Sequence, residues 1–150
     1  MRHEKIVKLL IERDDVEINL KIFNGWTPLS WAAEHGHETI VKLLIERDDV
    51  EINSKDRYDR TSLSFAAERG HKTIVKLLIE LDDVEINSED CNGRTSLSFA
   101  AERGHKTIVK LLIERDDVET DSKDRYGRTP LFWADLNEQK AVVELLQFSS

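Results

Sequence analysis

The sequence has little of what disulfide bonding or membrane insertion would require. Cys91 is the one cysteine among 150 residues, so no disulfide can form within the chain. A lone cysteine is typical of a reducing compartment, and we expect a cytoplasmic protein, with the nucleus as the alternative. No apolar run approaches the ~20 residues that a membrane-spanning helix needs, so no membrane association is expected.

An excess of basic residues is also missing. The formal net charge is -8 at pH 7, which opposes general affinity for nucleic acids and anionic membranes. The first residues are basic and then apolar, as in a signal peptide. The same segment recurs inside the chain, however, so it belongs to the fold.

The main feature that is present is an internal repeat, which decides the fold before any local pattern does. Threonine recurs at an interval of 34 residues, at Thr27, Thr61, Thr95 and Thr129. The segment from Arg60 to Glu80 is identical to that from Arg94 to Glu114. Such identity indicates either recent duplication or deliberate design.

Each unit is predicted to contain a helix, a turn, a second helix and a long loop. In the second unit Thr61 is a natural N-cap, because its hydroxyl can accept a hydrogen bond from a free N–H of the first turn. Leu63 to Ala67 continue this helix, and Gly70 ends it in a left-handed conformation. Ile74 to Ile79 form a second helix that is apolar over most of its circumference, before the acidic connector at 82–88. One unit cannot bury its own apolar surface, so the units must stack.

The repeat resembles the ankyrin family. The matching residues are Gly25-Trp26-Thr27-Pro28-Leu29, Ala32-Ala33, Gly36-His37 and Ile40-Val41-Lys42-Leu43-Leu44, with further copies at Gly93-Arg94-Thr95-Ser96-Leu97 and Gly127-Arg128-Thr129-Pro130-Leu131. The resemblance implies an all-α fold, an ankyrin repeat solenoid of stacked antiparallel helix pairs with protruding hairpin loops. It also implies a protein–protein interaction module that needs no cofactor and catalyses no reaction.

The chain departs from the family pattern at several positions. Serine or phenylalanine stands where the family has a histidine that bonds neighbouring units: Ser30, Ser64, Ser98 and Phe132. Those bonds are therefore in question. Asp59 replaces the hairpin glycine, and Asp is among the residues that best tolerate a positive φ. The interval is one residue longer than the usual 33, and we place the extra residue in the acidic loop.

The expected organisation is a single ankyrin repeat domain over 1–150. Its parts are a half repeat with only the second helix at 1–20, full repeats at 21–54, 55–88 and 89–122, and a C-terminal capping repeat at 123–150. Polar residues Asp135, Glu138 and Gln139 at packing positions indicate the cap. The half repeat leaves a bare N-terminal end, and we expect either a C-terminal fragment of a larger protein or an end that frays or self-associates.

No catalytic residue and no metal or cofactor site is expected. His37, His71 and His105 each follow a glycine in the repeating frame, so they are structural and about one unit apart. Cys91 is expected to be a free, exposed thiol without a recurring base beside it. Acid pairs such as Asp48-Asp49 lack calcium-loop spacing and predict a solvated acidic ridge.

The resemblance places partner-binding residues at the hairpin tips, at the position that follows, and at the end of each first helix. These residues are Phe23, Asn24, Trp26, Glu34, His35, Arg57, Tyr58, Arg60, Glu68, Arg69, Cys91, Asn92, Arg94, Glu102, Arg103, Arg125, Tyr126 and Arg128. Trp, Tyr and Arg are the side chains that most often dominate interface energies.

Arginines outnumber acids along this stripe, which predicts an acidic, extended partner surface and negative charge segregated into the Asp-Asp loops. Three alternatives stay open. The Glu/Arg pairs can serve solubility alone, Trp26 and Phe23 can cover the bare N-terminal end, and the near-identical units can form a structural spacer or designed scaffold without a partner.

Overall fold

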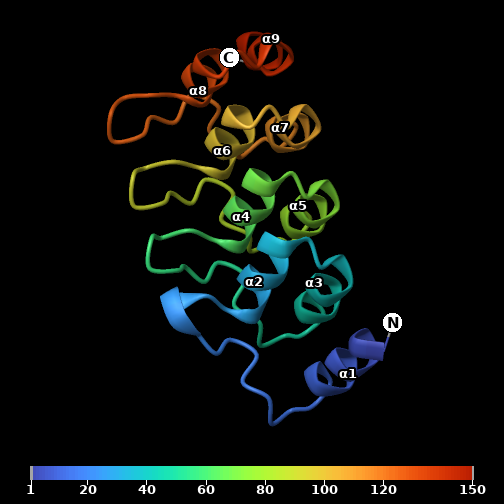
Figure 1. Cartoon of the computed structure of the whole chain (residues 1–150). Helices are drawn as coiled ribbons and strands as arrows, with labels where there is room; N and C mark the ends of the chain where they lie inside the picture. Colours follow the sequence, from blue (N-terminus) through green and yellow to red (C-terminus); the bar gives the residue numbers. More distant parts are fainter. Residues whose placement is uncertain (1, 150) are drawn as a thin grey trace.

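A computed structural model describes residues 2–149, which form nine α-helices, one 3-10 helix and no strand. The helices stand in two columns (Figure 1). We call the first helix of each pair an inner helix: α2 (Pro28–His35), α4 (Ser62–Arg69), α6 (Ser96–Glu102) and α8 (Pro130–Leu136). The outer helices are α1 (Arg2–Ile11), α3 (Glu38–Ile45), α5 (Lys72–Ile79), α7 (Lys106–Ile113) and α9 (Lys140–Gln147).

Stacking runs along each column, because every inner helix packs against the next and α3, α5, α7 and α9 do the same. The connecting segments protrude on the side of the inner helices (Figure 1), and the first contains the 3-10 helix η1 (Phe23–Gly25). The predicted all-α solenoid of helix pairs with hairpin loops is confirmed.

Each inner helix begins after a threonine that caps it, as predicted for Thr61. The Thr61 hydroxyl accepts from the N–H of Ser64, and the Ser64 hydroxyl accepts from the N–H of Thr61 at 3.0 Å. Thr27 and Ser30 form the same capping box. The serines that replace the family's histidine therefore complete hydrogen bonds inside their own unit.

The turn between paired helices depends on glycine. Gly36 and Gly70 have φ of 74° and 81° and end α2 and α4 in the left-handed conformation, as predicted for Gly70. A Cβ on Gly36 would also lie 2.7 Å from the His71 ring. Glycine thus meets two demands here, a positive φ and the close approach of the next unit.

The outer helices are more amphipathic than expected. On α5, Ile74, Val75 and Leu78 are fully buried, whereas Lys72 and Lys76 are exposed. The expectation of an apolar surface around most of the circumference was wrong, because the back of each outer helix faces solvent. The apolar side continues the core from unit to unit.

The two ends of the stack differ. At the first, α1 packs against α3 and leaves Ile6, Leu9 and Leu10 largely exposed. At the other, Glu138 adopts a φ of 57° in the place of the turn glycine. Within residues 2–149, no helix has the length and apolarity to cross a bilayer.

Candidate functional site

The predicted binding residues gather on one face, which we call the inner face. It consists of the tip residues 23–24, 57–58, 91–92 and 125–126, positions 26, 60, 94 and 128, and the helix ends 34–35, 68–69 and 102–103. Neighbouring tips are joined by backbone hydrogen bonds: Arg57 N–H to Asn24 O at 2.9 Å, Cys91 N–H to Tyr58 O at 2.8 Å and Arg125 N–H to Asn92 O at 2.9 Å. These bonds hold the tips in a fixed row.

Each of the last three hairpins also closes around a recurring aspartate that the sequence analysis did not single out. Asp56 Oδ1 accepts from the N–H groups of Tyr58 and Arg60 at 2.8 and 2.9 Å, and its side chain is fully buried. Asp124 repeats these contacts, as Asp90 does at 2.8 Å. The 34-residue spacing of the three aspartates was the available signal.

The charge state of Asp124 follows from these donors. Burial by itself would raise the pKa of the Asp124 carboxyl, but the N–H groups of Arg128 and Tyr126 and the Arg128 guanidinium outweigh it. The pKa therefore lies below its usual value, and the hairpin is built on an ionised carboxylate.

The arginines at positions 60, 94 and 128 belong to the scaffold. The Arg60 guanidinium lies 4.1 Å from the centre of the Phe65 ring and pairs with Glu68 at 3.3 Å. Arg94 lies 4.2 Å from the Phe99 ring, and its side chain is 13% exposed. These arginines are held against aromatic rings and acids, so the expectation that this position is exposed is corrected. Their part in partner binding stays a prediction.

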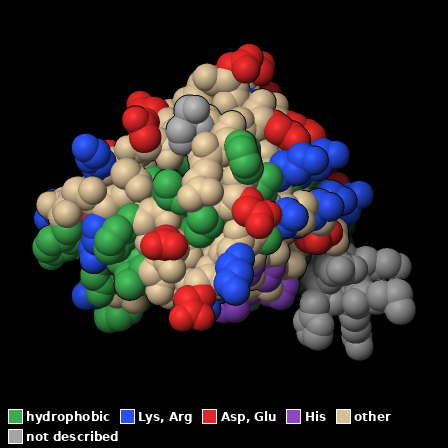
Figure 2. Space-filling model, turned by 90° about the horizontal axis from the view of Figure 1, so that it is seen from above, with side chains coloured by type: hydrophobic (Ala, Val, Ile, Leu, Met, Phe, Trp, Pro, Cys, Tyr) green, Lys and Arg blue, Asp and Glu red, His purple; other side chains and the backbone are tan. Residues whose placement is uncertain are grey.

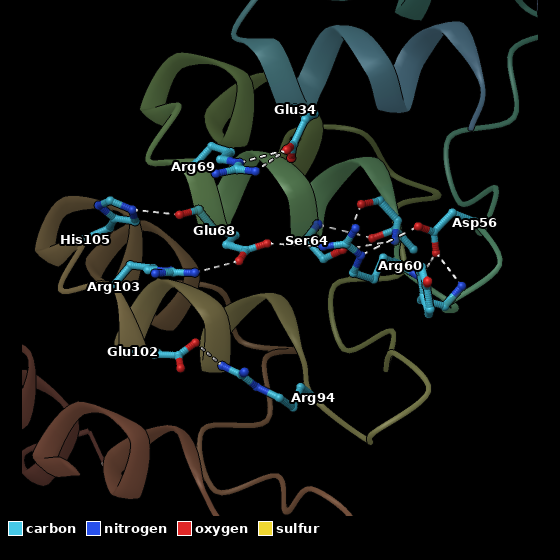
Figure 3. Close-up of polar contacts among 12 residues, drawn as sticks. Glu34, Asp56, Arg60, Ser64, Glu68, Arg69, Arg94, Glu102, Arg103 and His105 are labelled. Atoms are coloured by element: carbon cyan, nitrogen blue, oxygen red, sulfur yellow. Dashed lines mark hydrogen bonds and ion pairs between the residues drawn. The ribbon is translucent and has the colours of Figure 1, made fainter. Parts of the chain in front are cut away.

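A second set of ion pairs links neighbouring inner helices (Figure 3). Arg69 on α4 donates from Nε to Glu34 Oε1 at 2.8 Å, and Arg103 after α6 donates to Glu68 Oε1 at 3.0 Å. The arginine side chains are 54% and 53% exposed, whereas those glutamates are 10% and 14% exposed. The acids lie beneath, and the guanidinium groups face solvent in fixed positions.

Charge is therefore not segregated as expected. Asp56, Asp90 and Asp124 lie under the same hairpins as the arginines, and the space-filling view shows acidic and basic side chains interspersed (Figure 2). In the loops, Arg47 and Arg115 hold one acid of each pair, Asp49 and Asp117, and lower the pKa of these two carboxyl groups. Part of the predicted acidic ridge is thus neutralised locally.

The most accessible part of the inner face is the row of tips. Phe23 is 87% exposed, Tyr126 74% and Tyr58 44%, and hydrophobic and basic side chains mark the hairpin edge at the left of Figure 2. Arg57 and Arg125 are exposed beside these aromatic rings. Of the remaining tip residues, Asn92 is exposed, while Asn24 and Cys91 are half-buried, so the expected exposure of the Cys91 thiol is corrected.

The first full unit differs from the others. Trp26 is half-buried, with its ring centre 4.9 Å from that of Phe65 in the next unit. It therefore packs toward the second unit instead of covering the N-terminal end. His35 is exposed and stacks on Trp31 at 4.4 Å.

Two of the three recurring histidines, His71 and His105, connect units, in agreement with the structural role predicted for them, whereas His37 is exposed and stacks on Trp31 of its own unit. His71 Nε2 lies 3.0 Å from Glu34 O, and His105 Nε2 lies 2.9 Å from Glu68 O. In the described part of the chain, no group of three or more His, Cys, Asp or Glu side chains could hold a metal ion. The arrangement offers a rigid surface for contact.

Comparison with known families agrees with the repeat and with the helix pairs. A family model described as ankyrin repeats (3 copies) matches residues 1–90 and 81–149. A search among curated proteins finds no match.

Proposed function

Because this chain belongs to the ankyrin repeat family, we propose that it binds a partner protein across its inner face. Ankyrin repeats are generally protein–protein interaction modules and not enzymes. The tips and the inner-helix ends correspond to the concave surface with which the family contacts its partners. We propose a cytoplasmic, non-catalytic binding module that uses no cofactor.

One observation carries this proposal: the exposed side chains of the inner face are of the interface-forming kind and are held in place. Arg69 and Arg103 stand on buried carboxylates, and the tip row presents Phe23, Tyr58 and Tyr126 on hairpins joined by backbone bonds. Holding such side chains in advance reduces the entropy lost on binding.

The chemistry of these groups supports a partner with acidic side chains. The guanidinium groups of Arg69 and Arg103 use some of their N–H donors on Glu34 and Glu68 and keep others for solvent. Arg57 and Arg125 add exposed cations at the tips. Carboxylates are the natural acceptors for such donors, while the net charge of -8 disfavours nucleic acid.

The test is a capture experiment with a charge-matched control. The first variant replaces Arg57, Arg69, Arg103 and Arg125 by alanine; the second replaces the exposed outer-helix lysines Lys72, Lys76, Lys106 and Lys110 by alanine. For a partner captured with the wild-type chain, we expect the arginine variant to lose at least about 10-fold in affinity and part of its salt dependence. The lysine variant should bind as the wild type does. Equal losses in both variants would refute the inner face as the binding surface.

A spacer or scaffold without a partner is the second candidate. The identity of residues 60–80 and 94–114 favours it, since a binding surface usually varies between units. Self-association through exposed Leu9 and Leu10 is a further prediction. Sedimentation of the wild type and of a Leu9→Lys/Leu10→Lys variant over a range of concentrations measures it.

A further inference from the structure

Glu34 carries a buried carboxylate oxygen that has no donor. Its Oε1 accepts two hydrogen bonds from Arg69. Its Oε2 has no hydrogen-bond partner and is out of contact with water, and the side chain is 10% exposed. A buried acceptor without a donor carries the full cost of its lost hydration, so this oxygen marks an incomplete site.

The other units show which group completes it. In the second unit, Arg60 donates to Glu68 Oε2 while it lies over Phe65. In the third, Arg94 donates to Glu102 Oε2 at 2.7 Å. The chain therefore pairs this glutamate position with a guanidinium twice, and Figure 3 shows these two pairs together with the Arg69–Glu34 contact.

In the first full unit Trp26 stands at the arginine position, so the guanidinium is missing. Trp26 turns to the Phe65 ring and lies edge-on to His35, with ring centres 6.4 Å apart. Trp31 of the first full unit corresponds to Phe65 of the second, and it is 39% exposed. The arginine and phenylalanine positions of this unit are thus both aromatic, Trp26 and Trp31. A cation at the carboxylate can gain ion pairing and, where it also meets a ring face, cation–π attraction.

We propose that the first full unit receives an arginine side chain of the partner protein, in the slot that Arg60 and Arg94 fill in later units. This inference rests on the proposed function and adds a basic contact to an otherwise acidic partner surface. Arginine is favoured over lysine because the internal examples use a planar guanidinium, which can bond the carboxylate and stack on a ring at once. Rotation of the Trp26 or His35 side chain, a common change on binding, gives the guanidinium access to Glu34 Oε2.

The first experiment uses a small probe, so its outcome does not depend on finding the partner. A Gly-Arg-Gly peptide with blocked ends is titrated into the ¹⁵N-labelled chain and compared with the same peptide containing citrulline, which has the shape of arginine without its charge. We expect a saturable shift of the Trp26 indole N–H with the arginine peptide, at millimolar affinity, and a loss of at least about 5-fold with citrulline. Equal responses to the two peptides, or an unchanged response in Glu34→Gln, would overturn the proposal.

The second experiment places an arginine of the chain itself beside Glu34. Trp26→Arg restores the residue found in the later units, so we expect its melting temperature to lie a few degrees above that of Trp26→Leu. The Trp26 indole is absent from this variant, so its response to the arginine peptide is read from the backbone amides of Glu34 and His35, and we expect no shift there. A Trp26→Arg chain no more stable than Trp26→Leu would show that the slot does not favour a guanidinium. If the probe binds as expected but alanine at Arg57, Arg69, Arg103 and Arg125 leaves partner affinity intact, the slot stands and the proposed binding face fails.

Discussion

At the scale of single residues, the inner face is organised by buried acids. Asp56 and Asp124 hold their hairpins through N–H groups of the following residues, while Glu68 serves two arginines, one in its own unit and one in the next. Buried charges persist only when paired and hydrogen-bonded. The arginines at the surface are therefore positioned by acids that lie beneath them.

The low pKa of Asp124 gives this arrangement a pH dependence. Because the carboxyl is more acidic in the folded chain than in the unfolded one, its stabilising contribution is complete above the unfolded value of about 4. The contribution is lost as the pH falls through the folded value. Asp124→Asn should lower the free energy of unfolding by about 1 kcal/mol at pH 7 and reduce the loss of stability below pH 4.

Thermal unfolding between pH 3 and 7 measures this difference. The matched control is Asp121→Asn, because Asp121 is exposed. If Asp124→Asn lost as much thermal stability between pH 7 and pH 3 as the wild type does, the pH dependence assigned to the Asp124 carboxyl would be contradicted.

At the scale of elements, the hairpins and loops are shaped by residues that recur with a few exceptions. Asn53 joins two units, since it donates to Asp83 O at 2.7 Å and accepts from Glu85 N–H at 2.9 Å. The hairpin tip needs a left-handed residue, which is glycine in three units and Asp59, with φ of 61°, in the second. The positive φ of Asp59 therefore makes the second hairpin strained.

Asp59→Gly should raise the free energy of unfolding by about 0.5–1 kcal/mol. A left-handed conformation costs a non-glycine residue about 1–2 kcal/mol, and the greater freedom of glycine in the unfolded chain offsets part of this gain. Denaturant unfolding measures the change.

The reverse substitution provides the control. A Cβ at Gly127 meets no atom within 4 Å, whereas one at Gly93 lies 3.2 Å from the Arg125 backbone nitrogen. Gly127→Asp should therefore cost only the conformational term, and Gly93→Asp should cost more. Equal costs would indicate that contact with the next hairpin does not matter.

At the scale of the whole molecule, stability depends on neighbours. The helix α5 lies between α3 and α7 and buries Ile74, Val75 and Leu78 completely. The helix α1 packs on α3 and exposes Ile6, Leu9 and Leu10. Since a repeat array is stabilised mainly by contacts between adjacent units, opening should begin at α1.

Hydrogen exchange tests this order. Amides of α1 should exchange at least about 10-fold faster than those of α5, because local opening costs less where fewer apolar contacts are lost. The helix α9 is the control for a terminal position, since its Val142 and Leu146 are buried; it should be better protected than α1. Equal protection of α1 and α5 would contradict a stack that opens from this end.

The architecture and most local conformations could be predicted from the sequence. The family match and the helix pairs confirm the predicted repeat, and the roles of Thr61, Gly70 and Asp59 followed from chemistry that acts within a few residues. A 34-residue interval brings equivalent positions to one face, and the resemblance to the ankyrin family indicated which positions form the inner face.

Which side chains on that face are free could be seen only once the units were packed together. Arg60 and Arg69 belong to the same unit and look alike in sequence, yet Arg60 is held over Phe65 and Arg69 is exposed above Glu34. Likewise, the sequence does not show that Glu34 Oε2 lacks a hydrogen-bond donor. The physical reason is that burial and charge pairing depend on the folded arrangement. Arg60 meets Phe65 and Glu68 of its own unit only where the hairpin packs against the inner helix, and Arg69 reaches Glu34 only when the units stack.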